Sequence, residues 1–115
     1  MKSERMKPER GTFGVTWREF LGFTRLLYCI YRNFSCFEEK GFEEVSFTVS
    51  SVPFLGLEVK SESLSIYVFL NLEEDLIIFS SEGLVWNFSF SGLDCFSFIN
   101  ALGSFKKKVE EELKQ

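Results

Sequence analysis

The chain has 115 residues, a length typical of one domain with one hydrophobic core. Hydrophobic residues make up 45% of it and 15 residues are Phe, so apolar burial offsets the entropy of ordering and wholesale disorder is excluded. The formal net charge is −4 and there is no His, which removes the commonest general base near neutral pH, the Ser-His and Cys-His pairs and most zinc sites.

Residues 1–12 are expected to form a flexible basic arm, and residues 13–115 a single α+β domain. The arm mixes charges and carries no periodic apolar signal. Near the N-terminus no apolar stretch is followed by the small-residue cleavage site of a signal peptide. Arg25 and Arg32 interrupt the longest apolar region. We therefore expect no secretory signal, no membrane span and a cytoplasmic location.

A first helix is predicted from Trp17 to Asn33. Thr16 and Glu19 stand at capping-box spacing before it. The polar side of this helix is narrow, so its apolar residues are expected to be covered over most of its girth. Those expected on the apolar side are Phe20, Phe23, Thr24, Leu26, Leu27, Ile30, Tyr31 and Phe34, and those on the polar side are Arg18, Gly22, Arg25, Cys29 and Arg32.

Four or five antiparallel strands follow. Residues 44–50 alternate apolar and polar, as in a strand half exposed to water, and residues 55–62 are predicted to form an edge-like strand because Pro53 precedes them. Residues 63–71 and 75–81 are apolar on both faces, and residues 84–91 alternate again. Two-sided strands need cover on both faces, and we expect a homodimer to supply it.

A second helix is expected to start at residues 91–94, where Ser91 and Asp94 have capping-box spacing. Its apolar stripe should lie on the sheet, and comprises Phe98, Leu102, Phe105, Val109 and Leu113. The expected fold class is therefore α+β: an N-terminal helix, an antiparallel meander sheet of four or five strands and a C-terminal helix packed on the sheet.

The three cysteines, Cys29, Cys36 and Cys95, are odd in number and follow no motif spacing, so we expect reduced, buried thiols. On a continuous helix Cys29 and Cys36 are about 10 Å apart, too far for a disulfide. A reactive Cys29 thiolate beside the arginines is the alternative, and the lack of His makes it the weaker one.

Charge is divided unevenly along the chain. Residues 1–32 carry seven cations against three anions, whereas residues 33–105 carry two cations against eleven anions. The basic segment either contacts phosphates or an acidic protein, or it is a solvated helix face that pairs with the acidic sheet. As partner-binding residues we predict Lys2, Arg5, Lys7, Arg10, Arg18, Arg25 and Arg32.

No Gly-rich phosphate loop occurs, and no cofactor or metal is expected. The acidic runs at 38–39, 43–44 and 73–75 either hold a divalent cation or, as we prefer, form a solvated surface. Four strand aromatics are predicted at an interface or in the core: Tyr67, Phe69, Trp86 and Phe88. A base-stacking platform is the alternative, but the flanking positions lack the basic residues that such platforms use.

The segment "TWREF" opening a helix, followed by antiparallel strands and a C-terminal helix, is similar to the small α-β-β-β-α subunits of the signal recognition particle Alu domain. Those subunits present a basic sheet to RNA, whereas the sheet predicted here is acidic. The resemblance covers five residues and a topology, and the chain is not assigned to that family.

These observations favour a small non-enzymatic protein-interaction module, such as a regulator, inhibitor or adaptor, that binds itself and another protein. The alternative is a nucleic-acid-binding protein that uses residues 2–32, with affinity that falls steeply as salt rises. A third hypothesis, an enzyme that uses acidic residues and a metal, predicts a metal-dependent rise in melting temperature.

Overall fold

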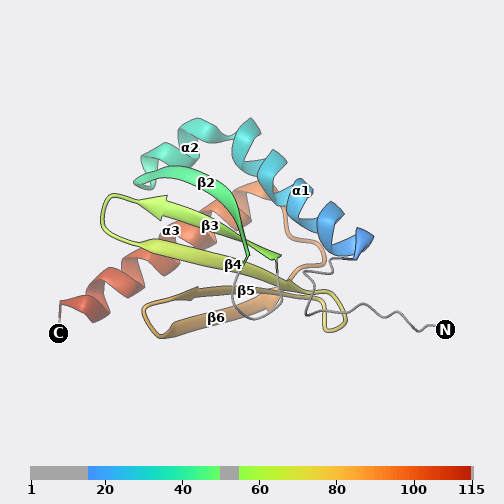
Figure 1. Ribbon diagram of the computed structural model, residues 1–115. Coiled ribbons are helices and arrows are strands. Elements are labelled where there is room, and N and C mark those ends of the chain that lie inside the picture. Colours follow the sequence, from blue (N-terminus) through green and yellow to red (C-terminus); the bar gives the residue numbers. More distant parts are fainter. Residues whose placement is uncertain (1–15, 50–54, 115) are drawn as a thin grey trace.

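The computed structural model describes residues 16–49 and 55–114. In this part of the chain two long helices cover one face of a five-stranded sheet, and a short helix links the first long helix to the first described strand (Figure 1). In chain order the elements are α1 (Trp17–Arg32), α2 (Phe34–Glu39), β2 (Phe42–Val49), β3 (Leu55–Ser61), β4 (Ser65–Asn71), β5 (Leu76–Ser81), β6 (Leu84–Ser89) and α3 (Cys95–Leu113). The predicted α+β fold is confirmed, and the expected arm of residues 1–12 lies outside the described residues.

The sheet is an antiparallel meander with the order β2-β3-β4-β5-β6, so each strand pairs with its neighbours in sequence. The prediction that the second strand is an edge strand is wrong, because β3 pairs with both β2 and β4. Pro53 stands before β3 and outside the described residues. It therefore removes no donor from the residues that form the β3 ladder.

Both long helices pack on one face of the sheet, which we call the inner face (Figure 1). Gly22 of α1 lies against Leu70 of β4, and the ring of Phe105 in α3 lies 5.7 Å from that of Phe79 in β5. The buried side chains on this face are Leu57, Val59, Ile66, Val68, Leu70, Ile77 and Phe79. Alternation of buried and exposed positions along β4 and β5 places the core here.

The predicted stripe of α3 is confirmed over most of its length. Phe98, Leu102, Phe105 and Val109 are fully buried, whereas Leu113 in the last turn is exposed. The change of apolar spacing after β6, from every second residue to every third or fourth, therefore marks the point where the chain leaves the sheet and returns to cover it.

The predicted start of α1 is confirmed as a capping box. Thr16 Oγ1 accepts from the backbone N–H of Glu19 at 3.1 Å, and the Glu19 carboxylate accepts from the N–H of Thr16 at 3.0 Å. The helix ends at Arg32, one residue earlier than predicted. There Asn33 donates from Nδ2 to the carbonyl oxygen of Cys29 at 3.0 Å, and the chain turns into α2.

The start of α3 differs from the prediction. Asp94, not Ser91, is the N-cap residue, and its Oδ1 accepts from the N–H of Ser97 at 2.8 Å. This hydrogen bond is the largest cause of a lowered pKa for Asp94. Ser91 instead donates its backbone N–H to Asp75 Oδ2 at 3.2 Å, in the turn between β4 and β5. The predicted Ser91–Asp94 capping box is therefore wrong, and Ser91 joins two turns instead.

The predicted buried side of α1 is confirmed for Phe23, Leu26 and Ile30 and wrong for Phe20, Thr24 and Tyr31. Its buried residues are Gly22, Phe23, Leu26, Cys29 and Ile30, whereas Phe20, Thr24, Tyr31 and Phe34 are exposed. Gly22 and Cys29 were assigned to the polar side. Gly22 packs so closely on β4 that a Cβ there would lie 2.6 Å from Leu70 Cδ1, and Cys29 is bonded to α3, so both residues face inward.

Candidate interaction surfaces

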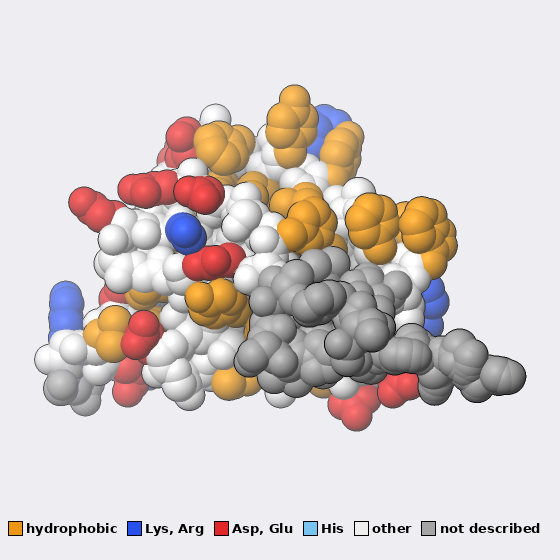
Figure 2. Space-filling view, viewed as in Figure 1, with side chains coloured by type: hydrophobic (Ala, Val, Ile, Leu, Met, Phe, Trp, Pro, Cys, Tyr) orange, Lys and Arg blue, Asp and Glu red, His pale blue; other side chains and the backbone are white. Residues whose placement is uncertain are grey.

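The side of α1 that points away from the sheet carries a stripe of large apolar side chains. Trp17 is 70% exposed, Leu21 50%, Tyr28 54% and Tyr31 77%. Figure 2 shows hydrophobic side chains gathered over α1, at the upper right of the molecule. With Thr24, these residues follow one another at intervals of four, three, four and three, which is the spacing of the seam between paired helices. We call these five residues the α1 seam.

Two of the three hydroxyl groups in the α1 seam, those of Thr24 and Tyr28, already have partners. Thr24 Oγ1 donates to the carbonyl oxygen of Phe20 at 2.8 Å, and Tyr28 Oη accepts from Arg32 Nη1 at 2.7 Å. Phe20 itself is 42% exposed and stacks on Trp17, with ring centroids 5.5 Å apart. Because Thr24 and Tyr28 each have an internal hydrogen bond, covering this surface costs less desolvation than the residue types alone indicate.

The three predicted arginines lie on the exposed surface of α1, but two of them have internal contacts. Arg25 Nη2 donates to the carbonyl oxygen of Leu93 at 2.7 Å, and its guanidinium lies 5.1 Å from the centre of the Phe90 ring. Arg32 lies over the Tyr28 ring at 5.6 Å. Among the described residues no hydrogen bond or ion pair involves Arg18. The other predicted cations, Lys2, Arg5, Lys7 and Arg10, lie outside the described residues.

Acidic side chains gather at the other end of the molecule. Figure 2 shows them at the left, over α2 and the start of β2. The exposed carboxylates of this region are Glu38, Glu39, Glu43 and Glu44. Figure 2 also shows acidic side chains at the lower right, so negative charge is not confined to this end.

The second surface is the face of the sheet opposite the helices, which we call the outer face. Among the described elements no helix covers it (Figure 1). Phe69 pairs with Ile78 across β4 and β5, and its ring fills the space above Gly56, where a Cβ would lie 2.8 Å away. Tyr67 is 37% exposed and Val85 is 55% exposed on the same face. This face is less apolar than the α1 seam.

The four aromatics predicted from the sequence divide between the two faces. Trp86 lies 5.1 Å from the ring of Phe105, and Phe88 lies 4.9 Å from that of Phe79, so both pack in the core on the inner face. Tyr67 and Phe69 lie on the outer face. No surface role was predicted for Trp17, Leu21 or Tyr28. The signal that could have indicated one is the seven-residue spacing from Trp17 to Thr24 and from Leu21 to Tyr28.

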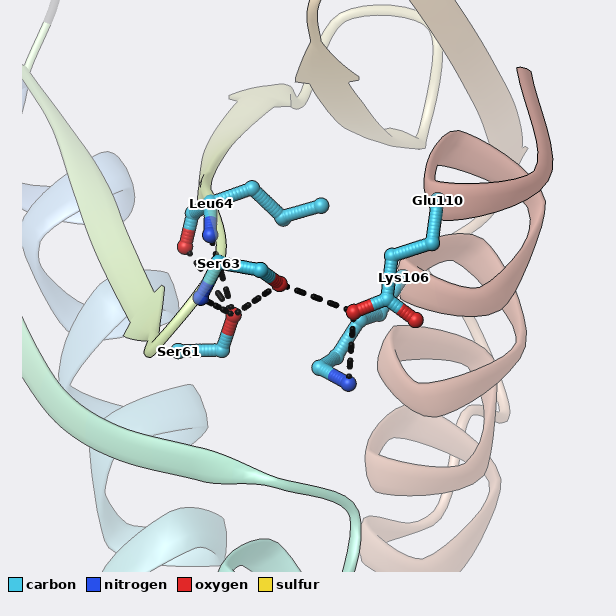
Figure 3. A network of polar contacts seen from close by, with 5 residues as sticks. All are labelled: Ser61, Ser63, Leu64, Lys106 and Glu110. Atoms are coloured by element: carbon cyan, nitrogen blue, oxygen red, sulfur yellow. Dashed lines mark hydrogen bonds and ion pairs between the residues drawn. The ribbon is translucent and has the colours of Figure 1, made fainter. Parts of the chain in front are cut away.

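A polar network joins the β3–β4 turn to α3 (Figure 3). Glu110 Oε2 accepts from Ser63 Oγ at 2.8 Å and pairs with Lys106 Nζ at 3.0 Å. These two contacts, that of Lys106 first, lower the pKa of Glu110. A hollow of about 360 Å³ lies beside it between α2 and α3. Because its pKa is lowered and one oxygen is engaged by Lys106 and Ser63, the carboxylate is a weak base and a poor proton donor at this hollow.

Cys29 and Cys95 form a disulfide between α1 and the first residue of α3, with a Cα–Cα distance of 5.1 Å. The prediction of reduced thiols is therefore wrong for these two residues. Three cysteines can form one disulfide and leave one free thiol. The spacing of Cys29 and Cys36 excludes only that pair, and not Cys29 with Cys95. Cys36 is free and half-buried.

The acidic runs do not assemble into a cation site within residues 16–49 and 55–114, where no three His, Cys, Asp or Glu side chains lie together in a metal-binding arrangement. None of the described helices has the length and apolar character of a membrane span. Compared with known proteins, the chain matches no family model, no curated protein and no solved structure. The surfaces described above are therefore the basis for a proposed function.

Proposed function

We propose that the protein is a small non-enzymatic protein-interaction module, acting as a regulator, inhibitor or adaptor, that forms a homodimer and binds another protein. The observation that carries this proposal is the pair of apolar surfaces, the α1 seam and the outer face, that the described elements leave uncovered. Large exposed apolar patches are uncommon on monomeric proteins and mark interaction sites. Two separate surfaces allow self-association and partner binding at the same time, as an adaptor requires.

The non-enzymatic part of the proposal depends on residue types and contacts. The chain has no His. Three described carboxylates have shifted pKa values, Asp75, Asp94 and Glu110, and hydrogen bonds lower the pKa of each, which favours ionised structural groups over proton donors.

We also propose a cytoplasmic location. The Cys29–Cys95 disulfide is the observation that makes this proposal necessary to test. Disulfides are rare in reducing compartments, apart from those of hyperthermophiles. Thiol labelling of protein taken from its native host under denaturing conditions tests this point. One reactive cysteine per chain indicates that the bond is present in the cell, and three indicate reduced thiols.

Nucleic-acid binding by residues 2–32 is less well supported. Contact with phosphates requires available guanidinium groups, and that of Arg25 is held by the Leu93 carbonyl and the Phe90 ring. Arg18 and Arg32 remain at the surface. The acidic net charge of the chain also repels nucleic acid at long range.

The test is the molar mass in solution by light scattering, over a range of protein concentrations, with and without mixed-sequence DNA and RNA at low and moderate salt. We expect the mass of a dimer that nucleic acid leaves unchanged. A monomer at every concentration contradicts the homodimer.

A mass shift with nucleic acid that disappears in salt supports the alternative function. In that case Arg18→Ala with Arg32→Ala should abolish the shift. The matched control, Lys107→Ala with Lys114→Ala, removes the same charge from exposed residues of α3 and its C-cap.

A further inference from the structure

We infer that the α1 seam is the surface on which a second copy of this chain binds, so that the α1 helices of two protomers pack against each other around Thr24. This inference rests on the proposed homodimer and specifies its interface. It assigns the outer face of the sheet to the other partner.

The exposed area of the seam is sufficient for a stable pair. The exposed fractions of four seam residues, Trp17, Leu21, Tyr28 and Tyr31, and of Phe20, which stacks on Trp17 beside the seam, are between 42% and 77%. With about 200 Å² for each fully exposed side chain of this size, these five residues present roughly 600 Å² per protomer. Two protomers would therefore bury about 1,200 Å², which is the lower end of the range for specific, stable interfaces.

The shape of the seam also fits a copy of itself. Thr24 is the smallest residue of the seam and lies at its centre, and bulky aromatic residues stand at its ends. Two helices that cross approach most closely at one point and diverge on both sides of it. A small central side chain permits the approach, and the large side chains fill the widening space. Because a two-fold interface uses the same patch on both subunits, this single pattern satisfies both protomers.

The α1 seam has the composition of the core of a protein interface, and the arginines beside it have that of a polar rim. No charged residue lies within the α1 seam, and α1 contains no Lys. Its only acidic residue, Glu19, caps the first turn through Thr16. The arginines border the stripe, and Arg25 is drawn toward Leu93. Tyr, Trp and Arg are enriched at protein interfaces, whereas Lys and Glu are depleted.

The outer face is less suited to self-association. Tyr67 and Val85 are its exposed apolar residues, whereas Phe69 and Ile78 are half-buried. Glu58 and Lys60 lie on the same face, and Tyr67 Oη is 3.5 Å from Glu58 Oε2. A face that mixes apolar and charged groups fits a partner with complementary polar groups.

The experiment compares Leu21→Glu in the seam with Val85→Glu on the outer face. The two sites are 50% and 55% exposed, so the substitutions disturb the fold equally little, which circular dichroism verifies. By sedimentation velocity, Leu21→Glu should raise the dimer dissociation constant roughly a hundredfold, because it puts an unpaired carboxylate into the interface. Val85→Glu should leave the constant unchanged.

A crosslink provides a second, independent measurement. In a Cys36→Ser background that keeps the Cys29–Cys95 bond, Thr24→Cys should form a covalent dimer on mild oxidation. The control Ser104→Cys, exposed on α3, should not.

The outcomes separate the inference from the proposed function. A wild-type dimer that Val85→Glu dissociates and Leu21→Glu does not would overturn the inference and leave the homodimer standing, as would a dimer without a Thr24→Cys crosslink. A monomeric wild type would overturn both. Binding of a monomeric wild type to vesicles of phosphatidylcholine and phosphatidylglycerol, lost in Leu21→Glu, would assign the seam to a membrane surface instead.

Discussion

Reduction of the Cys29–Cys95 disulfide is expected to lower the free energy of unfolding by about 4 kcal/mol. The bond joins residues 66 apart in sequence, so it closes more than half of the chain into one loop. Crosslinking a loop of this length removes conformational entropy from the unfolded chain, and the gain increases slowly with loop length. For a domain of this size, such a change corresponds to a melting temperature lower by roughly 15–20 °C.

The assay is thermal unfolding followed by circular dichroism, with oxidised protein, with excess dithiothreitol and with the variant Cys29→Ala/Cys95→Ala. The reductant and the double variant should give similar shifts, because both remove the same crosslink. Cys36→Ala is the control, since Cys36 is a free thiol. If the reduced protein melted within about 3 °C of the oxidised protein, the bond would not constrain the unfolded chain, and the reasoning would be refuted.

Three further changes test the core, the close approach of α1 and the response to acid. Phe105→Ala removes a fully buried ring and should cost about 3–5 kcal/mol, read from the urea midpoint. Gly22→Ala would place a Cβ 2.6 Å from Leu70 Cδ1, and displacing that buried side chain should offset the helix-propensity gain of about 1 kcal/mol; an increase in stability would contradict the packing. Hydrogen bonds from Ser91 and then Ser89 lower the pKa of Asp75 below 3.8, so the stability from its carboxylate is present above that value and lost as pH falls through the lowered pKa. Asp75→Asn, which tolerates the positive φ of 59° there, should therefore reduce the loss of stability below about pH 4 in acid titrations; an unchanged slope would refute this role.

Local patterns explain why so much of the fold could be predicted. The alternation along β4 and β5 and the three-to-four spacing of Phe98, Leu102 and Phe105 each report which side of an element is buried. Thr16 and Glu19 mark a helix start through contacts three residues apart. Such signals depend on neighbours in sequence and need no knowledge of the rest of the chain.

Contacts between distant segments could not be predicted in this way. No spacing rule relates Cys29 to Cys95, because their approach depends on how α1 and α3 lie together on the sheet. The change of N-cap from Ser91 to Asp94 has the same origin, since Ser91 is engaged by Asp75 from another turn. The same limit affected the candidate interface residues. Trp86, Phe88 and Tyr67 were predicted as one group of strand aromatics, and only the strand register shows that Trp86 and Phe88 lie on the inner face and Tyr67 on the outer face.

The orientation of α1 shows that side-chain size can be more informative than polarity. A helix that is apolar around most of its girth has no unique buried side, so periodicity favoured the aromatic positions for the core. Packing keeps Phe23, Leu26 and Ile30 in the core, as predicted, but leaves Phe20 and Tyr31 outside it. The inner side needs residues such as Gly22 and Cys29, which allow α1 to approach Leu70 and Cys95, whereas rings as large as Trp17 and Tyr31 remain outside. The sheet therefore does not cover these rings, and covering them requires a surface from another molecule, which the comparison of Leu21→Glu with Val85→Glu is designed to identify.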